Sequence, residues 1–403
     1  MKRNVPKLRF KGFSDEWESK RLGDFIEERS EKTEDKENYP LYSLTIENGV
    51  VPKSDRYERE FLVKKEGNFK IVQPNDFVYN PMNLRFGALA VYKGKIPVSV
   101  SGYYNVFNFN GESVSQFWSN YLKTDRMFYL YNTIATGSLE EKKRVHYSQF
   151  KELNLKMPKK EEQEKISNFL TKVDKLIEKQ EEKVTELEKY KKGMMQKIFS
   201  QEIRFKDENG GEYPEWEFKN IEDICEVKTG GTPSRQKKEY WENGTIYWMV
   251  SGEVNKRIVN NIDTKITLMG MENSAAKILP IGTVMIALNG QGKTKGTVAL
   301  LNVETTCNQS LAGFIPNETF NSKYLFYNLQ GRYREIRALA GDGERNGLNL
   351  GLLREILVQL PSLIEQEKIS KFFYKIDSII EKEKEKLEEL RVWKKGLLQG
   401  MFV

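Results

Sequence analysis

The chain has 403 residues, of which 38% are hydrophobic and 31% are charged, and its net charge is +7. This length supports two or three domains with separate cores, and the charge suits a polyanionic partner without establishing one. Two cysteines, Cys225 and Cys307, and one histidine, His146, exclude a disulfide framework, a four-cysteine zinc site and histidine clusters. No apolar stretch is long enough for a secretory signal or a bilayer span, so we expect a cytoplasmic protein.

An internal repeat determines the expected organisation. A shift of 203 residues aligns residues 157–199 with residues 360–402 without a gap, and 22 of the 43 aligned positions are identical. By contrast, residues 39–118 show little likeness to residues 228–320. Tandem duplication of a unit this large predicts pseudo-twofold symmetry. We expect the matching ends to form a shared scaffold and the middles to be two versions of one function.

The repeat divides the chain into four segments of an α+β fold. We expect two mixed α/β globular domains, at residues 1–157 and 200–360, and two long helices, at residues 158–199 and 361–403. The globular segments contain short β-branched and aromatic runs separated by Gly, Pro and Asn, as is typical of strands and turns. The first helix leads from one domain into the next and the second ends the chain. The simplest closure therefore pairs the two helices as an antiparallel coiled coil.

In the first globular segment, "NPMN" at Asn80 resembles the Asn-Pro-Pro-aromatic motif of amino-methyltransferases, but Met82 and Asn83 break the pattern. No glycine-rich cofactor loop accompanies it, so methyl transfer by this chain alone is not expected. Residues nearby are instead candidates for contacts with nucleic acid, and these are Asn83, Arg85, Tyr103 and Tyr104. Each is equally compatible with an ordinary solvated loop.

Both long helices show a heptad seam. From Ile166 and again from Ile369, apolar residues recur in alternating steps of four and three, which is the spacing of coiled-coil core positions. A stripe of this kind can also pack on its own domain, but two matched stripes favour pairing with each other. The expected seam residues are Ile166, Leu170, Val173, Ile177, Val184, Leu187, Met194, Ile198, Ile369, Phe373, Ile376, Ile380, Leu387, Leu390, Leu397 and Met401.

Polar residues interrupt the seam at the same two positions of each copy. They are Gln180 and Lys191 in the first helix and Glu383 and Lys394 in the second. Buried polar residues at such positions set the register of a coiled coil at some cost in stability, so we expect a register or partner-facing role. Exposed apolar residues beside the seam, such as Phe169, Leu176 and Met195, leave surface for a further partner.

The second globular segment contains two polar loops suited to binding phosphates or bases. "GGTPSRQKKEYW" at residues 230–241 combines backbone freedom with hydroxyl groups and three cations, and "NGQGKTKG" at residues 289–296 adds amides and two lysines. The second loop does not fit a nucleotide-binding P-loop, because Ala287 stands where G-x-x-x-x-G-K-T requires its first glycine. The candidate contact residues are Thr232, Ser234, Arg235, Lys237, Lys238, Asn289, Gln291, Lys293 and Lys295.

Together these features resemble the specificity subunit of type I DNA restriction-modification enzymes. The strongest marks are "EEQEKIS" at Glu161 and "IEQEKIS" at Ile364, the matching helix ends "KKGMMQKIF" and "KKGLLQGMF", the "GGTPS" loop, and "TCNQSLAGF" at Thr306. The resemblance covers the whole chain. The first half lacks a "GGTPS" counterpart, which fits a family whose two target-recognition domains differ.

The resemblance implies a non-catalytic subunit that reads double-stranded DNA. Each recognition domain would bind one half of a split, asymmetric target, while the antiparallel helices set the spacing and dock two modification subunits. S-adenosylmethionine for methylation of adenine N6, and ATP with Mg for cleavage by restriction subunits, would bind those partners, and neither a cofactor in this chain nor a membrane partner is expected. Two alternatives stay open: a coiled-coil adaptor that binds only proteins, and a stand-alone DNA-modifying enzyme, which the broken motifs disfavour.

Overall fold

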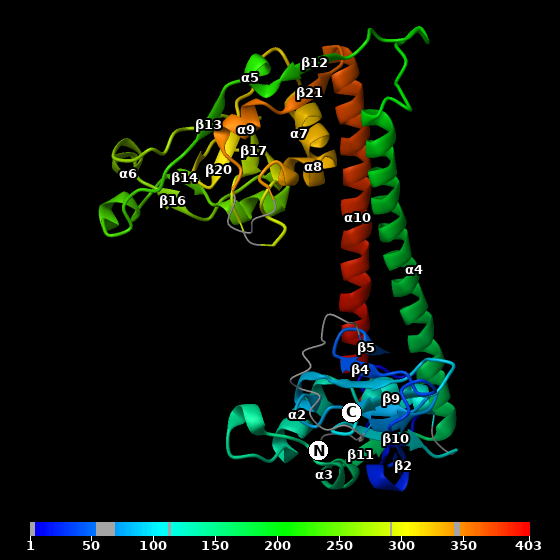
Figure 1. Ribbon diagram of the computed structural model, residues 1–403. Coiled ribbons are helices and arrows are strands. Elements are labelled where there is room, and N and C mark those ends of the chain that lie inside the picture. The colour runs from blue at the N-terminus through cyan, green and yellow to red at the C-terminus, as the bar shows by residue number, and fades with distance from the viewer. Residues whose placement is uncertain (1–4, 54–68, 112–113, 291, 342–346) are drawn as a thin grey trace. The chain divides into compact units, whose positions relative to one another are not determined.

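Two long helices dominate the computed structural model (Figure 1). They are α4, Lys160–Phe199, and α10, Leu363–Met401. Both begin close to the predicted positions, just after a proline that cannot continue a helix backwards. The structure describes residues 5–53, 69–111, 114–290, 292–341 and 347–403. In that part of the chain, no helix combines the length and apolar character that crossing a membrane requires.

The chain divides into two compact units. Unit 1 comprises Met1–Glu181 and Glu385–Val403, and unit 2 comprises Glu182–Lys384. Each unit therefore contains one mixed α/β globular segment together with part of α4 and part of α10. This arrangement confirms the predicted α+β architecture with two packed long helices.

Unit 1 is built from small antiparallel sheets and three short helices. The largest sheet has the order β2–β10–β7–β8, a second has the order β3–β6–β9, and β1–β11 and β4–β5 form pairs. The strands are β1 (Glu18–Arg21), β2 (Ile26–Arg29), β3 (Lys32–Thr33), β4 (Tyr42–Thr45), β5 (Gly49–Pro52), β6 (Phe69–Val72), β7 (Phe77–Tyr79), β8 (Leu89–Val91), β9 (Val98–Ser101), β10 (Asn105–Phe109) and β11 (Asn154–Met157). The helices are α1 (Ser115–Tyr121), α2 (Asp125–Ile134) and α3 (Tyr147–Lys151).

The core of unit 1 is largely aromatic. Phe107 and Phe109 lie two positions apart on β10, so both side chains leave the same face of the strand. Phe109 stacks on Trp118 of α1 with 4.9 Å between ring centroids. Phe402, which follows α10, stacks on Tyr121 at 5.1 Å. The last turn of α10 thereby completes the core of the first globular segment.

Unit 2 has a larger sheet with the order β13–β20–β17–β18–β15, a three-stranded sheet with the order β16–β14–β19, and the pair β12–β21. The strands are β12 (Glu217–Asn220), β13 (Val227–Thr229), β14 (Ile246–Met249), β15 (Ile258–Val259), β16 (Lys265–Ile266), β17 (Val284–Ala287), β18 (Val298–Leu301), β19 (Thr306–Cys307), β20 (Leu311–Phe314) and β21 (Leu357–Leu360). The helices are α5 (Ile221–Ile224), α6 (Leu268–Glu272), α7 (Ser322–Gly331), α8 (Tyr333–Ala338) and α9 (Leu350–Arg354).

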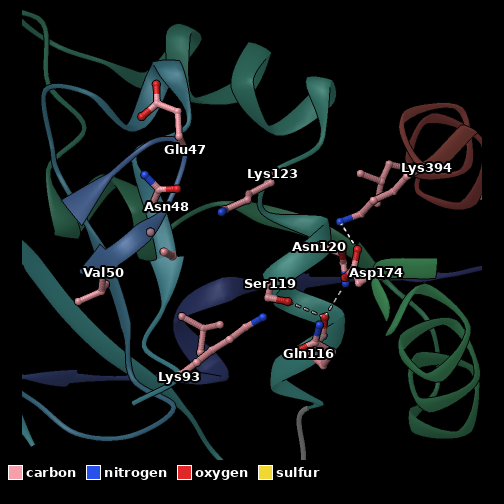
Figure 2. A pocket seen from close by; sticks show the side chains of 14 residues that line it. Glu47, Asn48, Val50, Lys93, Gln116, Ser119, Asn120, Lys123, Asp174 and Lys394 are labelled. Carbon is pink, nitrogen blue, oxygen red and sulfur yellow. Dashed lines mark hydrogen bonds and ion pairs between the residues drawn. The ribbon is translucent and has the colours of Figure 1, made fainter. Parts of the chain in front are cut away.

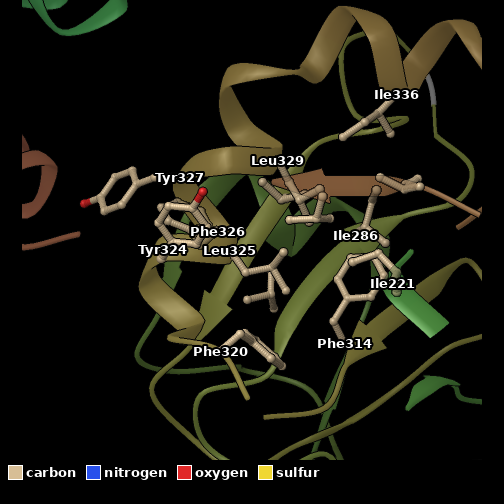
Figure 3. Close-up of a cluster of buried hydrophobic side chains, with 14 of the residues drawn as sticks. Ile221, Ile286, Phe314, Phe320, Tyr324, Leu325, Phe326, Tyr327, Leu329 and Ile336 are labelled. Atoms are coloured by element: carbon tan, nitrogen blue, oxygen red, sulfur yellow. The ribbon is translucent and has the colours of Figure 1, made fainter. Parts of the chain in front are cut away.

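The core of unit 2 lies between α7 and the larger sheet. Every residue of β17, β18 and β20 is buried, as the continuous apolar sequences of these strands predict. Figure 3 shows Leu325 and Leu329 of α7 beside Ile286 of β17 and Phe314 of β20. This rigid base positions the polar loops that leave the ends of the strands.

The repeated "EQEKIS" sequence fastens each helix to its own domain. In unit 1, Arg9 donates two hydrogen bonds, of 2.7 and 2.8 Å, to the carboxylate of Glu162. In unit 2, Arg204 donates to Glu365 at 2.8 Å, and the indole Nε1 of Trp216 donates to the same carboxylate at 3.0 Å. Glu162 and Glu365 are 2% and 0% exposed, so these arginines compensate carboxylates that burial would otherwise penalise.

The two helices run antiparallel within each unit, as predicted. In unit 1, Lys394 of α10 contacts Asp174 of α4 at 2.5 Å. In unit 2, Lys191 of α4 contacts Asp377 of α10 at 2.7 Å. These two pairs exchange places under the 203-residue shift, because Asp174 corresponds to Asp377 and Lys191 to Lys394. The two copies of the repeat therefore form equivalent contacts in the folded protein.

The apolar seam residues are buried or half-buried, and several of those near the helix ends also contact a globular core. The buried ones are Ile166, Leu170, Val173, Val184, Ile198, Ile369, Phe373, Ile376, Ile380, Leu387 and Met401, and the half-buried ones are Ile177, Leu187, Met194, Leu390 and Leu397. Of the polar positions, Lys191 and Glu383 are 7% exposed. Beside the seam, Leu176 is 51% exposed and Phe169 is half-buried. Met195 is only 7% exposed because it packs in the core of unit 2, so the prediction that it lies at the surface is wrong.

Candidate nucleic-acid interface

Arg235 is the centre of the most structured polar loop in unit 2. Its guanidinium carbon lies 3.8 Å from the ring centroid of Trp241 and 5.1 Å from that of Trp248. The two indoles meet edge to face at 5.0 Å. No carboxylate forms a salt bridge with Arg235 among the described residues. Aromatic contacts therefore orient the guanidinium, and its N–H groups are not committed to an ion pair.

The backbone around Arg235 is held by hydrogen bonds from the two tryptophans. Nε1 of Trp241 donates to the carbonyl of Ser234 at 3.0 Å, and Nε1 of Trp248 donates to the carbonyl of Gly231 at 2.9 Å. Gly231 packs tightly, because a Cβ atom there would lie 2.7 Å from the side chain of Ala275. The loop is thus fixed from both sides, which lowers the entropy cost of ordering it on a ligand.

The other candidates in this loop are exposed but have partners. The hydroxyl of Thr232 donates to Oε1 of Gln309 at 2.7 Å, which links the loop to the "TCNQSLAGF" segment. Lys237 donates to the hydroxyl of Tyr240 at 2.9 Å, and this hydrogen bond raises the lysine pKa. Lys238 lies 3.9 Å from Glu242. Ser234 is exposed, so the loop presents hydroxyl groups and cations on one short segment.

The second loop is placed differently from the sequence prediction at one position. Asn289 and Lys293 are exposed, as contact with a ligand requires. Lys295, however, is only 7% exposed and interacts within the protein, so it does not present its ammonium group at the surface. Gln291 lies outside the described residues. The sequence predicts Lys295 at the surface because it does not show which charged residue of a glycine-rich loop turns inward.

In unit 1, Arg85 also differs from the prediction, because it is 6% exposed. Its guanidinium donates to Glu140 at 2.6 Å and to Asn132 at 3.1 Å. Asn83 is exposed just before the short 3-10 helix at Leu84–Phe86, and Tyr103 is 44% exposed. Tyr104 is half-buried, and burial raises the pKa of its hydroxyl.

Tyr103 borders a hollow that sequence reasoning missed. The hollow has a volume of about 340 Å³, and its lining includes Arg144, His146 and Tyr147. The single histidine thus lies at the surface beside an arginine and two tyrosines. Residues 40 positions apart in the chain meet here, so no local pattern could have revealed the group.

A polar hollow lies in unit 1 beside the long helices (Figure 2). It has a volume of about 320 Å³ and is lined by three lysines, Lys93, Lys123 and Lys394, and by two acids, Glu47 and Asp174. Lys394 is paired with Asp174. Burial lowers the pKa of Lys123, and the neighbouring Lys394 and Lys93 lower it further.

The sites contain no sign of a reactive thiol. Burial raises the pKa of both Cys225 and Cys307 to about 12, so both remain protonated at neutral pH. Among the described residues, no group of three or more histidine, cysteine or acidic side chains is arranged to hold a metal ion.

Comparison with known proteins defines the class. Residues 14–189 and 213–392 each match the family model described as the type I restriction modification DNA specificity domain. Together these matches cover most of the chain, and the chain belongs to this family. Its members are the specificity subunits of type I restriction-modification systems, which are non-catalytic components.

Individual relatives agree with this assignment. The MjaVIII specificity subunit of Methanocaldococcus jannaschii is 26% identical over 94% of this chain and 90% of its own length. The MjaIX specificity subunit of the same organism is 28% identical, over 51% of this chain and 48% of that relative. The chain thus spans about half the length of the MjaIX subunit in that match. The EcoR124I/EcoR124II specificity subunit of Escherichia coli is 28% identical over 41% of this chain and 42% of the relative.

Solved structures share the fold. The S subunit from M. genitalium superposes with a TM-score of 0.58 over 99% of both chains at 16% identity. A chain from a study of complex assembly and conformational transition of the type I R-M system gives 0.59, over 95% of this chain and 96% of that one, also at 16% identity. At this identity the likeness concerns the fold alone.

Proposed function

We propose that this chain is the DNA-reading subunit of a type I restriction-modification complex. Residues 1–157 and 200–360 each bind one half of a bipartite, asymmetric target, and the paired helices carry two modification subunits and the restriction subunits. One observation carries the proposal: the arginine–glutamate contact that fastens each long helix to its domain is duplicated, whereas the polar surface loops of the two domains differ. S-adenosylmethionine, ATP and Mg bind the partner subunits.

Arg235 is the base-reading residue that the geometry of unit 2 favours. A guanidinium lying flat on an indole keeps its outer N–H groups available, and these match O6 and N7 of guanine in a bidentate contact. The stack on Trp241 and Trp248 sets its direction before DNA arrives. Thr232, Ser234, Lys237 and the exposed Lys293 are suited to phosphate contacts, which position the domain without reading sequence.

The experiment uses the assembled complex of this chain with its modification subunits. Methylation-sensitive sequencing of DNA from cells that carry the complex should report two half-sites and a fixed spacer. Arg235→Ala is expected to weaken recognition of one base in one half-site by about ten- to a hundredfold, the effect of losing a bidentate contact. Arg354→Ala, at an exposed arginine of α9, is the matched control.

Two outcomes would contradict the proposal. One is a single continuous recognition site, since it would not need two readers. The other is an equal loss at both half-sites after Arg235→Ala, since a residue of unit 2 would then not act through one half-site.

The surface of the long helices supports docking of two copies of one partner. Positions 172, 176, 179, 183, 186 and 190 of α4 are spaced by four and three residues and so form one stripe. Four of the six are identical in α10, and the other two remain apolar or aromatic, as Leu176 with Ile379 and Tyr190 with Trp393. These four side chains are 44–52% exposed. We call these six positions and their α10 equivalents the docking stripes.

A neighbouring stripe is less well preserved between the copies. Of positions 171, 175, 178, 182, 185 and 189 of α4, only 178 and 182 have the same residue in α10. Retention of exposed apolar residues in one stripe alone is expected when each copy binds the same partner. The same stripes favour the second candidate function, a protein adaptor without DNA readout. This function would be supported if Arg235→Ala left the methylation specificity unchanged and if neither half of the chain protected DNA.

A further inference from the structure

Two ion pairs between α4 and α10 lie at equivalent positions of the repeat, but the acid and the base have changed places between these positions. Glu181 of α4 contacts Arg391 of α10 at 2.7 Å in unit 1. Glu188 of α4 contacts Lys384 of α10 at 2.9 Å in unit 2. The 203-residue shift relates Glu181 to Lys384 and Glu188 to Arg391. The two contacts are therefore equivalent in the repeat, but α4 supplies both acids and α10 supplies both bases.

The aspartate–lysine pairs of the same helices behave differently. Asp174 with Lys394 and Asp377 with Lys191 convert into each other under the shift without any change of residue. Either helix could therefore form these pairs with the other helix or with a second copy of itself. They hold the antiparallel register but do not distinguish the partner.

The exchanged charges do distinguish the partner. If two copies of α4 paired in the register of the repeat, Glu181 of each copy would face Glu188 of the other, which places like charges at two contacts. If two copies of α10 paired, Lys384 of each would face Arg391 of the other, again with like charges. Only α4 with α10 brings opposite charges together at both contacts.

We propose that these exchanged charges select pairing of α4 with α10 and select against pairing between two copies of either helix. The apolar seam is nearly the same in both copies of the repeat, so it cannot make this choice. Lys183 of α4 also pairs with Glu383 of α10 at 3.0 Å, and the residue of α4 that corresponds to Glu383 is Gln180. Two copies of α4 would therefore lose this attraction, whereas two copies of α10 would keep it. Only the exchanged pairs discriminate against both kinds of self-pairing.

The effect has a modest size at each contact. The four side chains of the exchanged pairs are 42–52% exposed, so water and salt screen them. A variant can turn attraction into repulsion at both contacts between α4 and α10 and make the opposite change in the self-paired arrangement. Such a variant is expected to shift the equilibrium between these two kinds of pairing by about tenfold or more.

The test uses the full chain and variants that keep its composition and net charge. Glu181→Lys/Lys384→Glu places like charges at both interhelical contacts and opposite charges in both self-paired arrangements. Glu188→Arg/Arg391→Glu does the same. The quadruple variant restores opposite charges between α4 and α10. Glu182→Lys/Lys395→Glu exchanges two exposed charges that lie outside the docking stripes and form no ion pair in the described structure, and it is the matched control.

Two measurements are made on each variant: the dimer dissociation constant by sedimentation over a range of concentrations, and the urea midpoint of unfolding. Each double variant is expected to dimerise about tenfold more tightly or to unfold at lower urea, and the quadruple variant and the control are expected to match the parent. In 1 M salt the differences should shrink. The proposal is overturned if both double variants match the parent in both measurements, or if the quadruple variant remains as impaired as the double variants.

Discussion

Deprotonation of the buried Lys191 is expected to contribute stability to unit 2 as the pH rises from about 7.5 to about 9.5, because this lysine loses a proton more easily than in the unfolded chain. The ammonium group donates to Asp377 at 2.7 Å and to Gln330 at 3.0 Å, and it lies 5.1 Å from the ring centroid of Tyr327. Arg257 competes for the same carboxylate at 2.9 Å. The Lys191 side chain is 9% exposed. Burial and, after it, the charge of Arg257 lower its pKa, Asp377 opposes the change, and the resulting pKa is about 8.

The sign and size follow from proton binding. With a pKa of about 8 in the folded state and 10.5 in the unfolded chain, the unfolded state binds more protons between these values. Stability contributed by the neutral amine is complete above pH 10.5 and is lost as the pH falls through 8. Between pH 7.5 and 9.5 Lys191 should therefore add about 2 kcal/mol to the unfolding free energy, at up to about 1.4 kcal/mol for each pH unit.

Urea unfolding across this pH range, followed by a signal from unit 2, measures the increment. Lys191→Met removes the titrating group, so the pH-dependent rise should disappear. Lys394→Met, at the equivalent position of α10, is the matched control and should retain the rise because Lys191 is still present. The comparison with Lys191→Met cancels the opposing effect of Cys225 and Cys307, whose raised pKa values lower the stability of unit 2 as the pH rises above 9. A difference in unfolding free energy between parent and Lys191→Met that stays constant between pH 7.5 and 9.5 would refute the reasoning.

Two further changes test the scaffold. Arg204→Met leaves the buried carboxylate of Glu365 without its cation and is expected to lower the unfolding free energy of unit 2 by about 3 kcal/mol in urea, so an unchanged midpoint would show that this ion pair does not stabilise unit 2. Tyr190→Ala/Trp393→Ala is expected to weaken binding of modification subunits by about tenfold or more without moving the unfolding midpoint, as titration of the subunits would measure. Lys175→Ala/Ser378→Ala, at a position of the neighbouring stripe where the two copies differ, should leave that affinity unchanged. Equal weakening by both variants would count against the docking stripes.

The long helices were predictable from sequence because their signal is local and repeated. Steps of four and three residues fix which side of a helix is apolar, and the second copy shows that the pattern is not accidental. The two tryptophans that orient Arg235 were not predictable as a group. Trp241 and Trp248 are seven residues apart on different elements, and only the turn of the chain between them brings both indoles onto one guanidinium.

The charged residues that turned inward show the same limit. Arg85 and Lys295 lie in segments rich in Gly, Asn and Pro, where a charge is usually solvated. The carboxylate of Glu140 that compensates Arg85 is 55 residues away in the chain. Partners that distant leave no periodic trace, so a single sequence can identify which residues carry charge but not which charges are already paired.

The proposed DNA target explains why selective pairing of α4 with α10 is needed. An asymmetric, bipartite site needs two different readers at a fixed spacing, and one chain that holds both domains meets this need only if α4 pairs with α10. Self-pairing through α4 would present two copies of residues 1–157, and self-pairing through α10 two copies of residues 200–360, so either arrangement would read the same half-site twice. Glu181, Glu188, Lys384 and Arg391 oppose both arrangements at the positions where the duplicated helices would otherwise be interchangeable. Divergence at these four positions is therefore what allows two nearly identical helices to maintain an asymmetric assembly.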